Sequence, residues 1–335
     1  MEGNSKERRT REQCPPPPQQ YPWLLYLDNE ACEKNHIFCS TLEPTITYTK
    51  NIPELRDAEL WTVQHGWCLL ANLVSTAYKL FLWNPCSLQK IELPPVTPYV
   101  GSGCDCILSP SPTTTGQVCS IFLFSPYTTS IFYCQLGDKK WTEVDYREEM
   151  ASAMKGKSAS LVRCKSYLIK NPVYCNGCIY AESFGSFLVV IEEQSGNRCL
   201  KVSHILVLMP TLPPTRFNLI CRLLGYNNEL FRIEIVHTLD KVISVVVYKF
   251  EFSLSVWETV KSIKDKLFFV SYVDSPFACQ AINPETEGGR IYFTLPYKNF
   301  IYIYNIEDKS LMFSQPFPNL LEMTSCLMWF MPDIR

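Results

Sequence analysis

The chain has no strong charge of either sign. Its 31 Lys and Arg residues nearly balance its 33 Asp and Glu residues, which leaves a formal net charge of −2. Proteins that bind nucleic acids or anionic membranes normally present a basic surface. We therefore expect neither nucleic acid nor a membrane among the partners, while a local basic patch stays open as an alternative.

A long apolar segment is also missing. Between Leu93 and Gly137 the only charged residue is Asp105, but prolines, serines, threonines and glycines interrupt this stretch repeatedly. A membrane-spanning helix needs about 20 mostly apolar residues in a row. The sequence therefore predicts no spanning helix.

The first 20 residues lack the apolar core of a secretory signal. They carry mixed charge and four consecutive prolines, Pro15 to Pro18. We predict that residues 1–20 form a disordered, Pro-rich leader and that the protein is cytoplasmic, nuclear or both. The basic residues of this leader could act as a nuclear address, although a solvated tail is the commoner explanation of such a run.

Catalytic motifs are absent from the sequence. It contains no Gly-x-Ser-x-Gly, no phosphate-cradling glycine loop and no His-Glu-x-x-His. Its four histidines are scattered over different segments: His36, His65, His204 and His237. The adjacent pairs Glu192-Glu193 and Glu148-Glu149 should not converge, and a solvated turn explains them better than acid-base chemistry. We predict a protein that is not an enzyme and has no cofactor.

Cysteine, by contrast, is abundant. Most of the 16 cysteines stand inside strand-like runs, where a free thiol packs as a small hydrophobe. Cys175 and Cys178 have the spacing of half a zinc knuckle, and Cys104 and Cys106 form another close pair. No second pair completes a tetrahedral ligand set, so we expect neither a metal site nor structural disulfides.

The feature that dominates the sequence is a repeat of about 50 residues. Each copy has an apolar, aromatic-rich strand, a polar turn and a second strand. Six copies are recognisable, beginning at His36, Phe81, Ile131, Leu188, Val245 and Ile301. Strands that recur at this period without helical segments are typical of the blades of a β-propeller.

The sequence therefore predicts an all-β fold, a single β-propeller of about six blades, each a four-stranded antiparallel sheet. Five or seven blades stay open as alternatives. The propeller should occupy residues 21–335, with its first strand near Trp23 and its ring closed by a strand from each terminus. Residues 148–160 should form a short helix or a loop on the rim.

Turn residues and tryptophans mark the blades. Asn176-Gly177 has the two-residue form favoured in tight hairpins, and Gly288-Gly289 should act similarly. We predict these structural markers: Trp67, Trp83, Asn84, Pro85, Trp141, Gly177, Trp257 and Gly289. Loop aromatics such as Tyr99, Tyr127 and Tyr226 are better candidates for contact with a partner.

Five segments recur in a known order and spacing: His65-Gly66-Trp67-Cys68-Leu69-Leu70, Leu80-Phe81-Leu82-Trp83-Asn84-Pro85, Ile91-Glu92-Leu93-Pro94-Pro95, Asn176-Gly177-Cys178-Ile179-Tyr180 and Gly289-Arg290-Ile291-Tyr292-Phe293-Thr294. Together they resemble a plant family of F-box-associated β-propellers, described as KIB-type or F-box/kelch-like. The resemblance runs roughly from Trp23 to Pro318.

The resemblance implies a protein-interaction module, the substrate-recognition part of a cullin-RING ubiquitin ligase. In this family an F-box binds a Skp1-type adaptor, and one known target is a shaggy-like kinase. An F-box is about 45 residues of helices, and the roughly 20 residues before the first predicted strand are too few and too rich in proline to form one. The alternative is a propeller enzyme or small-ligand binder that uses the central channel.

Overall fold

A computed structural model describes residues 21–28, 35–41, 47–50, 58–97, 103–109, 112, 114, 116, 118–154, 167–183, 187–194, 199–207, 217–283, 287–317 and 327–331. The predicted leader, residues 1–20, lies outside these ranges. In the described part of the chain no helix has both the length and the hydropathy needed to cross a bilayer.

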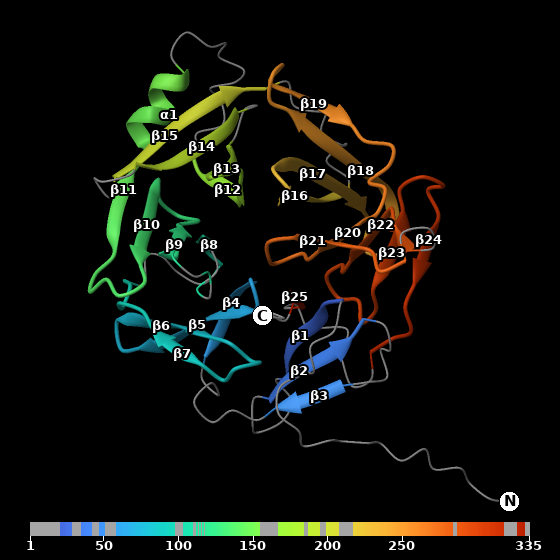
Figure 1. The fold of residues 1–335 in the computed structure, drawn as a ribbon, viewed down its shortest axis with the longest axis horizontal. Helices are drawn as coiled ribbons and strands as arrows, with labels where there is room; N and C mark the ends of the chain where they lie inside the picture. The colour runs from blue at the N-terminus through green and yellow to red at the C-terminus, as the bar shows by residue number, and fades with distance from the viewer. Residues whose placement is uncertain are drawn as a thin grey trace, which may run out of the picture.

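Six β-sheets stand in a ring around a central axis (Figure 1), so the predicted six-bladed β-propeller is confirmed. The strands of each sheet are given from the axis outward. The first two sheets are β25 (Met328–Phe330), β1 (Trp23–Asp28), β2 (Asn35–Ser40) and β3 (Thr47–Lys50), and then β4 (Glu59–Gln64), β5 (Trp67–Val74), β6 (Ala77–Trp83) and β7 (Lys90–Glu92). The next two are β8 (Asp105–Ser109), β9 (Ser120–Phe124), β10 (Ser130–Gln135) and β11 (Thr142–Asp145), and then β12 (Ile169–Cys175), β13 (Cys178–Ser183), β14 (Phe187–Gln194) and β15 (Cys199–Leu206). The last two are β16 (Asn218–Tyr226), β17 (Glu229–His237), β18 (Val242–Glu251) and β19 (Val256–Thr259), and then β21 (Phe277–Gln280), β20 (Lys266–Val270), β22 (Arg290–Phe293), β23 (Tyr302–Asn305) and β24 (Leu311–Phe313).

The sequence repeat corresponds to the two outermost strands of every sheet. Its six copies fall on β2–β3, β6–β7, β10–β11, β14–β15, β18–β19 and β23–β24. The third strand of a blade packs against both neighbouring blades, so its apolar and aromatic residues recur from blade to blade.

Apolar layers between the blades form the core. Each of six buried clusters draws its residues from two neighbouring sheets, and together the clusters continue around the ring. One example is the pairing of Phe38 from β2 with Phe330 from β25, whose ring centroids are 5.5 Å apart in the cluster shared with the β4–β7 sheet.

Two strands from opposite ends of the chain close the ring, as predicted. β25 pairs antiparallel with β1, and Trp23, Leu24 and Leu25 lie opposite Phe330, Trp329 and Met328. The first sheet is thus completed by the last strand, and its inner edge is covered.

The sheet that contains β20 departs from the four-stranded pattern. After β20 the chain turns inward to form β21, which becomes the innermost strand, and then returns so that β22 pairs parallel with β20. The prediction that Gly288-Gly289 forms a hairpin turn is therefore wrong. Gly289 has a φ of +78°, and its N–H donates to the Lys266 carbonyl at 3.1 Å at the start of this parallel pair.

Other local predictions hold. Asn176 and Gly177 have φ values of 48° and 81° and join β12 to β13, as a tight hairpin of the primed type requires. The rim segment forms the helix α1 (Arg147–Met154), with Glu148 and Glu149 in its first turn, where acidic side chains favour the helix dipole.

Deleting residues 323–335 tests the ring closure. Without β25, the inner edge of β1 loses its partner and buried apolar residues of two clusters become exposed. We expect the truncated protein to aggregate, as measured by size-exclusion chromatography. A soluble, monodisperse product would contradict closure by this strand.

Gly225 tests how closely the inner strands approach one another. A Cβ atom on this residue of β16 would lie 2.5 Å from the Tyr174 carbonyl oxygen of β12, a backbone atom with no side-chain freedom to move away. We expect Gly225→Ala to lower the free energy of unfolding by about 1–3 kcal/mol, measured by denaturant titration. Gly177→Asn is the control, because Asn tolerates positive φ and nothing lies near the position; equal stability of both variants would refute the steric argument.

Candidate functional site

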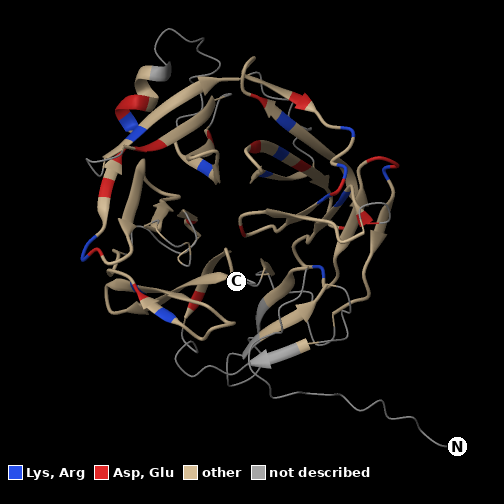
Figure 2. Ribbon diagram, in the orientation of Figure 1, with Lys and Arg blue, Asp and Glu red and all other residues tan. Residues whose placement is uncertain are grey.

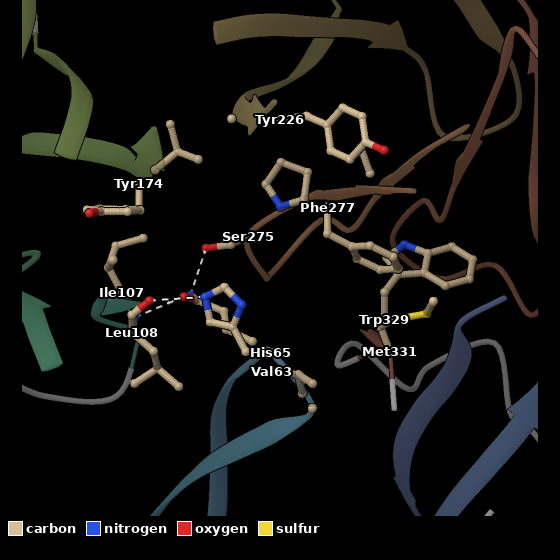
Figure 3. A pocket seen from close by; sticks show the side chains of 16 residues that line it. Val63, His65, Ile107, Leu108, Tyr174, Tyr226, Ser275, Phe277, Trp329 and Met331 are labelled. Carbon is tan, nitrogen blue, oxygen red and sulfur yellow. Dashed lines mark hydrogen bonds between the residues drawn. The ribbon is translucent and has the colours of Figure 1, made fainter. Parts of the chain in front are cut away.

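The innermost strands of all six sheets meet at a cavity of about 550 Å³ in one end of the central channel (Figure 3). Its walls are mostly apolar and aromatic. They consist of Val63, Gln64, His65, Gly66, Ile107, Leu108, Val173, Tyr174, Gly225, Tyr226, Ser275, Pro276, Phe277, Ala278, Trp329 and Met331. A cavity of this size lies in the range of about 300–1,000 Å³ that is common for small-ligand sites.

Gln64 ties three inner segments together at the cavity wall. Its side-chain Nε2 donates to the Cys106 carbonyl at 2.6 Å, and its Oε1 accepts from the Leu108 N–H at 3.0 Å. The same amide nitrogen lies 3.4 Å from the Ser275 hydroxyl oxygen. Next to it, Nε2 of the His65 ring lies 3.2 Å from the Leu108 carbonyl oxygen. Figure 3 shows this ring at the cavity wall.

Asp274 lies deeper along the axis and is fully buried. Its carboxylate accepts from the Thr62 hydroxyl at 2.6 Å and from the Val63 N–H at 3.1 Å, so the segment before β21 is fastened to β4. Burial raises the pKa of Asp274 from 3.8 to about 7, although these hydrogen bonds and Arg222 act in the opposite direction.

A second carboxyl, that of the half-buried Asp105, faces the same part of the channel. Asp105 accepts from the Asn171 N–H at 3.1 Å, and the Asn171 side-chain oxygen accepts from Arg222 at 2.8 Å. Burial raises the pKa of Asp105, while the positive charge of Arg222 opposes the rise. Asp105, Asn171, Arg222 and Asp274 surround a space of only about 10 Å³. We call these four residues the axial polar cluster.

Residues from β8, β12, β16 and the approach to β21 converge in the axial polar cluster, and the sequence repeat does not reveal this convergence. Within the described ranges, no three His, Cys, Asp or Glu residues are grouped so that they could hold a metal ion. The hydrogen bonds of the cluster join β8, β12 and β16, and those of Asp274 join its segment to β4.

The predicted markers all lie outside the cavity wall. Trp67 and Trp83 are buried in different interblade clusters, and Asn84 accepts from the N–H groups of Cys86 and Ser87 at 2.8 and 3.0 Å, in a turn that also buries Pro85.

The remaining markers are also at blade boundaries or turns. Trp141 donates its indole N–H to the Pro94 carbonyl of the preceding blade at 2.8 Å. Trp257 packs against Phe250, and the centroids of the two rings are 5.0 Å apart. Gly177 and Gly289 occupy the two turns described above.

The adjacent glutamates of β14 do point apart, but they do not lie in a solvated turn. Glu192 pairs with Lys201 of the same sheet at 3.2 Å, whereas Glu193 accepts from Ser120 at 3.1 Å and from Gln135 at 2.9 Å in the preceding blade. Glu193 thus links two blades, a role that its neighbourhood in the sequence does not reveal.

The histidines and cysteines do not assemble into one site. His204 packs against Phe187, and His237 is buried with Nδ1 2.9 Å from the Thr238 carbonyl; the side chain of His36 lies outside the described part. The twelve cysteines that the structure describes are free thiols, and Cys104 and Cys106 stand with their sulfur atoms 3.5 Å apart.

Of the three loop tyrosines, Tyr226 lines the cavity, Tyr127 is exposed, and Tyr99 lies outside the described residues. Tyr127 belongs to a wider pattern. In an antiparallel blade, the turns between first and second strands and between third and fourth strands share one end, while the turn between second and third strands lies at the other. The cavity is at the first of these ends, because Val63–Gly66, Val173–Tyr174 and Gly225–Tyr226 precede or form first-to-second turns.

At the opposite end, the three described turns between second and third strands and the β22–β23 turn of the five-stranded sheet each carry a large exposed apolar side chain. The exposed fractions are 43% for Val74, 70% for Tyr127, 69% for Leu239 and 55% for Tyr297. Tyr297 belongs to the β22–β23 turn. β20 starts at the cavity end, where Lys266 lies 3.6 Å from Glu229 at the start of β17, and β22 runs parallel to β20. The β22–β23 turn therefore lies at the opposite end of the blade. We call these four residues the apolar turn face.

Comparison with known proteins identifies the fold family. Residues 29–314 match the family described as KIB1-4 beta-propeller. No curated protein matches the chain. Solved structures are similar at low identity. TolB from Acinetobacter baumannii is 11% identical over 93% of this chain and 68% of its own, with a TM-score of 0.47. A protein from Lactobacillus plantarum is 6% identical over 93% and 99%, with a TM-score of 0.42.

The buried carboxyl of Asp274 should make the free energy of unfolding depend on pH. Its pKa is higher in the folded protein, about 7, than its ordinary value of 3.8, so the folded state binds the proton more tightly. The stability that this proton supplies is fully present below about pH 4 and is lost as the pH rises towards 7. We expect Asp274→Asn to flatten the decline in unfolding free energy between these values, measured by denaturant titration at several pH values.

Thr129→Ala is the control for this prediction, because Thr129 donates at 2.6 Å to Asp145, a carboxyl at the surface whose pKa is lowered mainly by that bond. It should leave the decline between pH 4 and 7 in place. An Asp274→Asn variant with the slope of the unmodified protein would show that Asp274 is ionised throughout this range.

Proposed function

The chain belongs to the KIB1-4 β-propeller family, and from this premise we propose that it is a recognition propeller, which binds a protein target and performs no catalysis of its own. The rigid blades present turns whose side chains can contact a partner without any change in the core. A cofactor, a nucleic acid and a membrane have no part in this function.

The apolar turn face is the observation that carries the proposal. Large apolar side chains at four turns of one end are exposed to solvent. Exposed apolar groups that gather on one face are a common sign of a protein-binding surface, and aromatic residues such as Tyr127 and Tyr297 supply much of the binding energy at such surfaces.

The distribution of charged residues over the ring also supports a protein partner. Figure 2 shows Lys and Arg interspersed with Asp and Glu around the ring, without a blade of one sign. A mixed surface of this kind favours specific contacts with a protein over the sequence-independent attraction that nucleic acids exert on basic surfaces.

The resemblance to plant F-box-associated propellers indicates both a target and the process in which that target is recognised. We infer that the propeller recognises a substrate of a cullin-RING ubiquitin ligase, with a shaggy-like kinase as the first candidate, in the cytoplasm, the nucleus or both. It either joins the ligase itself or competes with relatives that do for the same target. A direct contact with a Skp1-type adaptor belongs only to the first of these routes.

A matched pair of leucines in one blade tests the binding face. Leu239 stands at the β17–β18 turn of the apolar turn face, and Leu254, with 66% of its surface exposed, stands at the β18–β19 turn on the opposite end. We expect Leu239→Asp to reduce capture of the kinase by roughly tenfold, or about 1–2 kcal/mol. Leu254→Asp should leave capture unchanged.

The measurement is affinity purification of the tagged full-length protein from plant tissue, with mass spectrometry scored for shaggy-like kinases, Skp1-type adaptors and cullin. Recovery of adaptor and cullin with the kinase indicates a ligase subunit, and recovery of the kinase alone indicates competition. No recovery of the kinase, or equal loss in both leucine variants, would contradict the proposal.

A further inference from the structure

The cavity in the channel mouth lies at the opposite end of the blades from the apolar turn face, so target binding does not account for it. We propose that this cavity is a binding site for one small, uncharged, ring-bearing molecule. The proposal is independent of the target-binding function.

The chemistry of the wall argues for an uncharged ligand. Among the sixteen described residues that line the cavity, none is Asp, Glu, Lys or Arg. The carboxyls of Asp105 and Asp274 lie one level deeper, where hydrogen bonds already engage them. An ionic group inside the cavity would lose its hydration without gaining a partner of opposite charge, which is costly.

The shape argues for a compact molecule. Tyr174, Tyr226, Phe277 and Trp329 supply ring faces from four different blades, and Figure 3 shows them around the open space. Along the axis the cavity is followed by the space of about 10 Å³ within the axial polar cluster, which suffices for about one water molecule. A chain could not thread through this constriction, so the occupant ends within the cavity.

Two dyes with the same ring system test the preference for neutral ligands. N-phenylnaphthylamine is uncharged, and anilinonaphthalene sulfonate adds one negative charge to the same rings. We expect the fluorescence of the neutral dye to rise on titration with the full-length protein and to saturate at one site. The sulfonate should bind at least about tenfold more weakly, because its charge must be desolvated.

Two methionines provide the matched variants. Met331 lines the cavity, whereas Met312 lies on the outermost strand β24, and both are partly exposed. Met331→Glu should weaken binding of the neutral dye at least about tenfold, while Met312→Glu should leave it unchanged. Tyr174→Glu serves as a second cavity variant, since Tyr174 is partly exposed and can carry a charge without unfolding the blade. Circular dichroism on heating verifies that each variant is folded.

Several results would overturn the proposal. They are the absence of saturable binding of the neutral dye and equal loss in the Met331 and Met312 variants. Equal binding of the neutral and sulfonated dyes would reveal a general apolar surface of the kind that a partner's loop covers, and it would overturn the proposal as well. Each of these readouts is independent of kinase capture.

Discussion

The need to bury both faces of every sheet controls the architecture. A blade whose third strand is apolar on both sides is stable only between two neighbours, and six interblade clusters meet that need around a closed ring. No blade is a terminal one, so the two ends of the chain must share a sheet. The pairing of β25 with β1 is therefore a requirement of the core rather than a separate feature.

At the axis the requirement is different, because little space remains there for large apolar side chains. Six inner strands converge there, and their backbones come so close that Gly225 of β16 has no room for a side chain beside β12. Large apolar residues cannot fill so narrow a space, and polar groups that satisfy one another can. The extra strand β20 brings Asp274 to this position, where it binds β4, and Arg222 reaches across from β16 to Asn171 of β12. The irregular sheet thus supplies the segment that ties the inner strands together.

These two requirements explain how much the sequence predicted. The outer strands have similar surroundings in every blade, so their residues recur and six blades could be counted from them. The inner strands meet only at the axis, and each faces different neighbours. Asp105, the only charged residue between Leu93 and Gly137, was the visible signal of a buried polar site, but the local sequence does not show that Asn171 and Arg222 lie beside it. Likewise, the inward turn of β21 depends on contacts with β16 and β4, which are distant in the chain, and a Gly-Gly pair that normally suggests a hairpin could not reveal it.

The same geometry separates the two proposed binding surfaces. β17 runs from the cavity end to the turn that carries Leu239, and nine residues of strand span roughly 30 Å. A protein bound at the apolar turn face therefore cannot touch a molecule in the cavity directly. Any coupling between the two would have to pass through the inner strands and the axial polar cluster, whose hydrogen bonds hold neighbouring blades in register. Because such a packed polar layer has little freedom to rearrange, we expect the cavity and the apolar turn face to act as independent sites on one rigid scaffold.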